Sequence, residues 1–172
     1  MRRTADGCER SFSELYDRYG QRMHNYFYRM LWQDVRIAED FTQDLFLKII
    51  EKRAYYDPEK RFSTWIYTVA GNMVKNEYRR VSRKKPLPEM KDILEENFSE
   101  NIDNVVFENQ LNKALDNLDD VQKQCFILRY QEEMSMKEIA DIIGCPEGTV
   151  KSRLFYTVKK LANNLRVFAG VF

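Results

Sequence analysis

The stretch from Ser135 to Leu161 constrains the fold of this chain most, because it places helix start and stop signals close together. Ser135 followed by Glu138 is a capping box, in which each side chain accepts a hydrogen bond from the other residue's backbone amide. Gly144 can adopt the left-handed conformation that ends a helix, and Pro146 suits the first turn of the next. Two helices joined by so short a turn must cross steeply. We therefore predict a helix-turn-helix.

At about 100° per residue, each of these two helices has an apolar face. The inward residues should be Ile139, Ala140 and Ile143 in the first, and Val150, Leu154, Thr157, Val158 and Leu161 in the second. The other side of the second helix carries hydroxyls, cations and aromatic rings, which can contact base edges, phosphates and thymine methyl groups. A helix face that contacts only water rarely carries exposed aromatic rings such as these. We predict that this face contacts DNA through Thr149, Ser152, Phe155, Tyr156 and Lys159, with Lys151 and Arg153 on its flanks.

The composition favours an all-α fold, and the length fits one medium domain or two small ones. The 172 residues are 44% hydrophobic, with six Gly and four Pro, and helix formers dominate. No apolar run approaches the roughly 20 residues that cross a bilayer, and the N-terminus lacks an apolar signal segment, so we expect a cytoplasmic protein. Cys8, Cys125 and Cys145 are far apart in sequence and should be free thiols. The sequence indicates no metal site and no cofactor.

Net charge divides the chain into three blocks. Residues 1–85 carry a net charge of +6, residues 86–120 carry −8, and residues 121–172 carry +3. Two basic bodies joined by an acidic connector suggest two domains that face nucleic acid and a linker with a different role. An acidic connector that is merely soluble and extended explains the charge equally well. We expect a domain at 1–82, an acidic linker at 83–104 and a helix-turn-helix domain at 105–172.

The N-terminal part begins with an amphipathic pattern over residues 12–32, which indicates one helix or a pair kinked at Gly20. A second helix is expected over residues 37–52, with Ala38, Thr42, Leu45 and Ile49 facing inward. Its outward face combines acidic and amide side chains with one apolar residue. Such a face is typical of a contact surface for a basic protein partner, although a solvated helix with one stray leucine would look similar. The residues are Asp40, Gln43, Asp44 and Leu47.

A loop at residues 55–61 and a helix at about 63–80 interleave aromatic rings with cations. Unpaired bases are held by stacking on rings and by cations along the backbone, so we predict a surface for single-stranded nucleic acid. Trp65 lies on an apolar helical stripe and is better placed for the core than for stacking. The candidate contacts are Tyr55, Tyr56, Lys60, Arg61, Asn72, Lys75, Arg79 and Arg80.

Three motifs together carry a family resemblance. They are RIAEDFTQDLFLKI at residues 36–49, FSTWIYTVAGNMVKNEYRR at 62–80 and EEMSMKEIADIIGCPEGTVKSRLFYTVKKL at 132–161. In this order and spacing they resemble the extracytoplasmic-function (ECF) group of bacterial RNA polymerase sigma factors. The resemblance covers most of the chain.

The resemblance implies a role for each predicted surface. Asp40, Gln43, Asp44 and Leu47 would bind the clamp of the largest subunit of core RNA polymerase. The loop and helix at 55–80 would melt the minus-10 promoter element and hold a flipped non-template base near Tyr56 and Asn72. The helix-turn-helix would recognise the minus-35 element, with Arg129 and Arg153 as phosphate contacts. The linker would run through the polymerase, and the family makes an anti-sigma factor an expected partner.

Two other functions have weaker support. The hypothesis of a stand-alone helix-turn-helix repressor or activator accounts for the C-terminal third of the chain. It does not account for the acidic helix face or the aromatic loop. A nuclease metal site could be imagined at Glu39, Asp40, Asp44 and Glu51, yet these residues surround an exposed leucine and have no neighbouring lysine or histidine. We therefore expect that the chain is not an enzyme.

Overall fold

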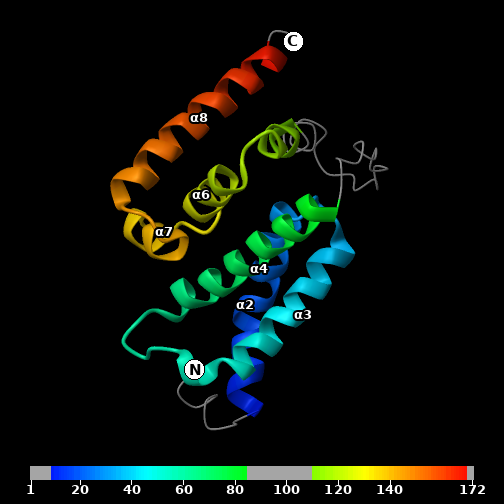
Figure 1. Ribbon diagram of the computed structural model, residues 1–172, viewed down its shortest axis with the longest axis vertical. Helices are drawn as coiled ribbons and strands as arrows, with labels where there is room; N and C mark the ends of the chain where they lie inside the picture. The colour runs from blue at the N-terminus through cyan, green and yellow to red at the C-terminus, as the bar shows by residue number, and fades with distance from the viewer. Residues whose placement is uncertain (1–8, 85–109, 170–172) are drawn as a thin grey trace.

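The structure is a computed structural model that describes residues 9–84 and 110–169, and every regular element in these ranges is helical (Figure 1). This confirms the all-α prediction. Most of the predicted linker, 83–104, and the start of the domain expected from 105 lie outside the described residues. In chain order the helices are α2 (Glu9–Met30), α3 (Val35–Glu51), the 3-10 turn η1 (Arg53–Tyr55), α4 (Phe62–Lys84), α6 (Asp120–Tyr130), α7 (Met136–Ile143) and α8 (Glu147–Ala169); residues 110–116 are also helical.

Helices α2, α3 and α4 form the N-terminal domain, in which α3 returns alongside α2 (Figure 1). α2 is one continuous helix, so Gly20 does not produce the kink that was one of the two predicted possibilities. Gly20 is buried beneath Tyr16, whose ring would lie 3.4 Å from an added Cβ. The core of this domain combines aliphatic side chains with buried aromatic rings, and the Tyr26 and Tyr67 rings meet edge to face at 5.3 Å. Such pairs add a modest attraction to the burial of their area.

The α2–α3 turn places two consecutive non-glycine residues in the left-handed region. Trp32 has φ 55° and Gln33 has φ 56°, a conformation that costs on the order of 1 kcal/mol or more per residue. Neighbouring contacts support the turn. The Trp32 ring packs edge-on against Tyr78 at 5.6 Å, and the Tyr78 hydroxyl donates to the carbonyl of Met30. The Gln33 amide N–H donates to the Tyr28 carbonyl at 3.0 Å. Contacts from Tyr78 of α4 therefore help to stabilise the strained turn.

The residues predicted to start and end the helices of the helix-turn-helix do so in the structure. The Ser135 hydroxyl accepts from the Glu138 amide at 3.3 Å, and the Glu138 carboxylate accepts from the Ser135 amide at 3.0 Å. Gly144 ends α7 with φ 75°, and Pro146 lies immediately before α8. The Pro146 carbonyl accepts from the Thr149 and Val150 amides and so starts the hydrogen-bond ladder of α8.

The inward faces of α7 and α8 are confirmed with two corrections. Ile139 and Ala140 are buried as predicted, but the third fully packed residue is Ile142, whereas Ile143 is half-buried. α7 lies between α4 and α8, and this two-sided packing needs a wider apolar surface than one stripe. In α8 the prediction for Val158 was wrong, because it lies at the edge of the stripe and is 39% exposed. The buried residues there are Val150, Leu154, Thr157 and Leu161.

The two domains share one hydrophobic core. α7 packs against α4, and α6 packs against α2. The same buried cluster contains Ile66 and Ala70 from α4 together with Leu128 from α6 and Ile139 from α7. A smaller cluster within the C-terminal domain joins Leu115 and Leu118 to Leu161. The helix-turn-helix is thus attached to the N-terminal domain by burial of apolar surface.

We expect Ser135→Ala to lower the free energy of unfolding by about 1 kcal/mol, because the N-cap hydroxyl of α7 is lost. Urea denaturation followed by circular dichroism measures the change. Ser13→Ala, at an exposed position within α2, is the matched control and should change stability by a few tenths of that amount. Equal effects of the two substitutions would show that the capping box contributes nothing.

Candidate nucleic-acid and partner interfaces

The outward face of α3 is arranged as the sequence predicted. Asp40, Gln43, Asp44 and Leu47 are exposed, and the Leu47 side chain is 58% exposed. The opposite face is anchored in the core through Ala38, Thr42, Leu45 and Ile49. Because a rigid helix holds these four outward residues, they form one acidic and amide surface around a leucine. Its role as a partner surface stays a prediction.

The loop before α4 holds its two tyrosines differently. The Tyr56 hydroxyl donates to the Lys60 carbonyl at 2.7 Å, and the Tyr56 ring meets Trp65 edge to face at 5.3 Å. Phe62 completes this aromatic cluster, with its ring centroid 5.9 Å from that of Tyr56. Tyr55, at the end of η1, is 82% exposed. Tyr56 is therefore part of a preformed aromatic wall, whereas Tyr55 extends into solvent.

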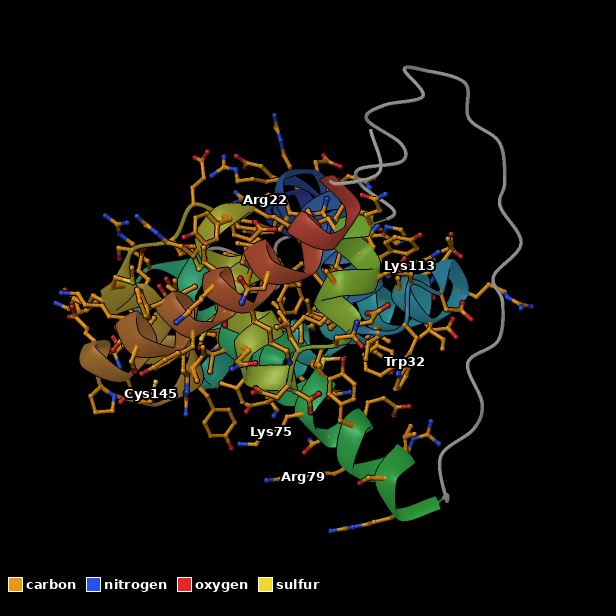
Figure 2. All side chains as sticks on the ribbon, turned by 90° about the horizontal axis from the view of Figure 1, so that it is seen from above. Arg22, Trp32, Lys75, Arg79, Lys113 and Cys145 are labelled. Atoms are coloured by element: carbon orange, nitrogen blue, oxygen red, sulfur yellow. The ribbon has the colours of Figure 1, made fainter. Side chains whose placement is uncertain are left out.

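Polar side chains follow one side of α4 beyond this cluster. Trp65, Asn72 and Arg79 are spaced by seven residues, which is close to two helical turns, so they lie along the same side of the helix. Asn72, Lys75 and Arg79 are exposed, and Figure 2 shows Lys75 and Arg79 projecting from α4 away from the rest of the molecule. The next residue, Arg80, forms an ion pair with Glu77 at 2.5 Å. The structure thus continues the aromatic loop into a cationic stripe.

The cations at the start of α4 have distinct environments. Lys60 is exposed, and Arg61 forms an ion pair with Glu138 of α7. The Arg61 Nη1 atom lies 2.9 Å from Glu138 Oε1, while the other oxygen of this carboxylate, Oε2, accepts from the Ser135 amide and hydroxyl. One carboxylate therefore closes the capping box and also contacts the other domain.

The outward face of α8 presents rings and cations to solvent. Phe155 and Tyr156 are 65% and 62% exposed, and their rings meet edge to face at 5.5 Å. Lys151, Ser152 and Lys159 are also exposed. Thr149 is half-buried, and its carbonyl accepts from the Ser152 hydroxyl at 3.0 Å. This is the arrangement that the sequence predicted for a helix that enters the major groove.

Two predicted phosphate contacts also serve the fold of the C-terminal domain. Arg129 is half-buried, and its Nη1 donates to the Met134 carbonyl at 2.8 Å, which ties α6 to the turn before α7. Arg153 is half-buried with its Nη1 3.5 Å from the Cys145 sulfur. Cys125 and Cys145 are free thiols as expected, whereas Cys8 lies outside the described residues. Burial raises the pKa of the Cys125 thiol to about 11.

Sequence analysis did not identify a polar cluster between the two domains. Arg22 of α2 contacts the Glu132 carboxylate through Nε at 3.1 Å and Nη2 at 2.9 Å (Figure 2 labels Arg22). Gln124 donates to the Tyr26 hydroxyl at 3.0 Å, and Arg29 donates to Gln131 at 2.6 Å. Burial raises the pKa of Tyr26 above its ordinary range. About a hundred residues separate the partners, so no local pattern could reveal them.

Among the residues that the structure describes, no helix is both long and apolar enough to cross a membrane. In the same ranges no three His, Cys, Asp or Glu side chains gather in a way that could hold a metal ion.

Both domains match regions of one protein family. Sigma-70 region 2 matches residues 15–84, and Sigma-70, region 4 matches residues 108–161. The first range contains the α3 face, the aromatic loop and α4, and the second contains the helix-turn-helix. The chain belongs to the sigma-70 family, in its ECF group. The family resemblance inferred from the three motifs is thereby confirmed.

Named relatives of this sigma factor agree along nearly the whole chain. ECF RNA polymerase sigma factor SigW of Bacillus subtilis is 26% identical, over 96% of this chain and 95% of the relative. The ECF RNA polymerase sigma-E factor of Haemophilus influenzae is 28% identical, over 96% and 93%. The fold is similar to that of the sigma factor RpoE of Bartonella quintana, which was solved in complex with the anti-sigma factor NepR. The TM-score is 0.75 at 21% identity, over 91% of this chain and 98% of that chain.

Hydrogen bonds from Ser135, and then the Arg61 contact, hold the pKa of Glu138 below its ordinary value of 4.5. A carboxyl group whose pKa is lower in the folded state stabilises the fold above its unfolded pKa, and this stabilisation is lost as pH falls through the folded pKa. We expect the free energy of unfolding to decline below about pH 4.5. Glu138→Gln, which can still form a capping box, should show a smaller decline in urea titrations. Identical pH profiles for the variant and the wild type would exclude Glu138 as a contributor.

Proposed function

We propose that this sigma factor binds core RNA polymerase, directs it to specific promoters and helps to melt the minus-10 region. The observation that carries the proposal is the occurrence of the two sigma-70 matches in one chain, over the helices that present the three surfaces described above. A stand-alone repressor or activator would need only the helix-turn-helix and is not favoured. Members of this family are transcription initiation factors, in agreement with the expectation that the chain is not an enzyme.

The α3 face is proposed as the polymerase-binding surface. Asp40, Gln43, Asp44 and Leu47 are exposed together on a helix whose other side is fixed in the core. Carboxylates and an amide around an exposed leucine would suit a partner surface with basic residues around an apolar depression. The acidic charge would speed association, and burial of Leu47 would add to the affinity.

The loop before α4 and the exposed side of that helix are proposed to hold the melted minus-10 strand. Tyr56, Phe62 and Trp65 form an aromatic wall next to the exposed Tyr55. Asn72 follows two helical turns beyond Trp65 and could recognise a base edge through its amide. Lys75 and Arg79 continue the line as cations suited to the phosphate backbone, with Lys60, Arg61 and Arg80 beside them.

The helix α8 is proposed to contact the minus-35 element in the major groove. Lys151 and Ser152 lie in its N-terminal half, from which recognition helices contact base edges. Phe155 and Tyr156 can pack against thymine methyl groups, and Thr149 and Lys159 would contact the backbone. Arg129 and Arg153 are proposed as phosphate contacts.

We further propose an anti-sigma factor as a partner. The similar RpoE chain was solved with the anti-sigma factor NepR, and the fold agrees over 91% of this chain. Both the polymerase and the promoter lie in the bacterial cytoplasm, so a cytoplasmic location follows as a prediction from the proposed function.

Asp44→Arg should weaken binding to purified bacterial core RNA polymerase about tenfold or more, because it places a cation on the acidic α3 face. Fluorescence anisotropy of the labelled protein against core polymerase measures the affinity. Asp17→Arg, an equal charge reversal at an exposed site on α2, is the matched control and should leave the affinity nearly unchanged. Unchanged affinity of Asp44→Arg would remove α3 from the interface.

Tyr56→Ala should slow promoter opening by the polymerase holoenzyme roughly 5- to 150-fold, the loss expected when a base loses a stacking partner worth about 1–3 kcal/mol. Permanganate footprinting of unpaired thymines measures opening, and a filter-binding assay measures initial recruitment, which should be preserved. Tyr56→Phe keeps the ring and removes the hydroxyl that donates to the Lys60 carbonyl, so stacking should stay close to wild type. Full opening by the alanine variant would contradict a role for this ring.

A further inference from the structure

The aromatic wall of Tyr56, Phe62 and Trp65 packs against a further ring, Tyr19 of α2. The Tyr19 and Phe62 rings meet edge to face, with their centroids 5.1 Å apart and their planes at 73°. The Phe62 centroid lies 5.8 Å from that of Trp65 and 5.9 Å from that of Tyr56. Tyr19 therefore contacts the ring that touches both other members of the wall.

Phe62 lies where support from another helix matters most. It is the first residue of α4, and the ends of helices fray because their terminal backbone groups lack intrahelical partners. Tyr19 lies in the middle of α2, which runs without interruption from Glu9 to Met30. A ring in the interior of one helix thus holds a ring at the end of another.

Hydrogen bonds within the loop hold Tyr56 from its other end. The Tyr56 hydroxyl donates to the Lys60 carbonyl, and the Lys60 amide donates to the Asp57 carbonyl at 3.1 Å. The Asp57 carboxylate also accepts from the Glu59 amide at 3.0 Å. These bonds shape the loop itself, whereas the contact between Tyr19 and Phe62 joins the wall to α2.

The wall combines packing with access to solvent. Its three rings are each half-buried, so part of each ring packs against protein and the rest meets solvent. An unpaired base can stack on such a ring. A ring that is already held in place loses less freedom when the base binds, so support of the wall favours capture of the base.

We propose that Tyr19 is a positioning residue for capture of the melted minus-10 strand. Its ring holds Phe62, and Phe62 holds the other two rings of the wall in the orientation that stacks on a base. Tyr19 acts through Phe62 and does not touch the DNA. The capture of a base rests on the proposed function, whereas the support of the wall by Tyr19 does not.

Hydrogen exchange of the free full-length protein, followed by mass spectrometry, tests the support. The Lys60 amide donates to Asp57 and the Trp65 amide donates to Arg61, so both report on opening of the loop and of the first turn of α4. Tyr19→Ala should speed exchange in this segment roughly two- to tenfold, the change expected when one aromatic pair is lost. Tyr19→Phe keeps the ring and should restore the wild-type rate.

Tyr16→Ala is the matched control, because it removes the same type of ring about one turn earlier in α2. The Tyr16 ring packs on Phe46 of α3, with centroids 4.8 Å apart. Its loss should leave exchange at Lys60 and Trp65 unchanged. Far-ultraviolet circular dichroism should show wild-type helix content for each variant. Tyr19→Leu, which keeps apolar volume without a ring, takes the place of Tyr19→Ala if the alanine variant unfolds.

Promoter opening by the holoenzyme tests the functional part. At saturating core polymerase, Tyr19→Ala should slow the appearance of permanganate-reactive thymines roughly two- to tenfold, again the loss of one aromatic pair. Initial recruitment, measured by filter binding, should be preserved. Tyr19→Phe and Tyr16→Ala should both open the promoter at the wild-type rate.

A double-mutant comparison separates positioning from general stability. In a Tyr56→Ala background the supported ring is already absent, so Tyr19→Ala should slow opening by less than it does in the wild type. An equally large loss in that background, or unchanged exchange at Lys60 and Trp65, would overturn the proposal. Normal opening by Tyr56→Ala would instead refute the proposed role of the loop, and the exchange rates would still decide whether Tyr19 supports the wall.

Discussion

The burial of apolar surface between α4 and α7 is the contact on which the rest of the arrangement depends. α7 has only eight residues, and a helix of that length is marginal in isolation. It is stabilised by packing on both sides, against α8 and α6 within its own domain and against α4 of the other. Glu138 stabilises both the start of α7 and the contact between the domains, because one carboxylate oxygen completes the cap of α7 and the other contacts Arg61. Local folding and contact between domains thus share one residue.

The amino-acid sequence predicted the features that depend on residues close together in the chain. The capping box at Ser135 and Glu138, the left-handed Gly144 and the exposed face of α3 all follow from spacing within a few residues, and all are present. The exposed rings of α8 were predicted in the same way. These features were accessible because the signal and the structure involve the same short segment.

Features that depend on distant partners were missed. Ile142 is buried because α7 packs on two neighbours, and a single helical stripe did not include it. The Arg22–Glu132 pair joins positions 110 residues apart, and neither residue stands out in its own segment. The paired left-handed residues of the α2–α3 turn depend on support from Tyr78, a side chain on another helix. Whether the proposed interface residues contact polymerase and DNA depends on molecules outside the chain.

The positions of the two tryptophans make the N-terminal domain optically distinct. Trp65 lies in the aromatic wall with Tyr56, and Trp32 packs on Tyr78 at the strained turn, so both indoles belong to one domain. The C-terminal domain has tyrosines but no tryptophan. Intrinsic indole emission would therefore report on the surroundings of the loop and the turn without a label. The distribution of a residue type thus provides this protein with a domain-specific spectroscopic reporter.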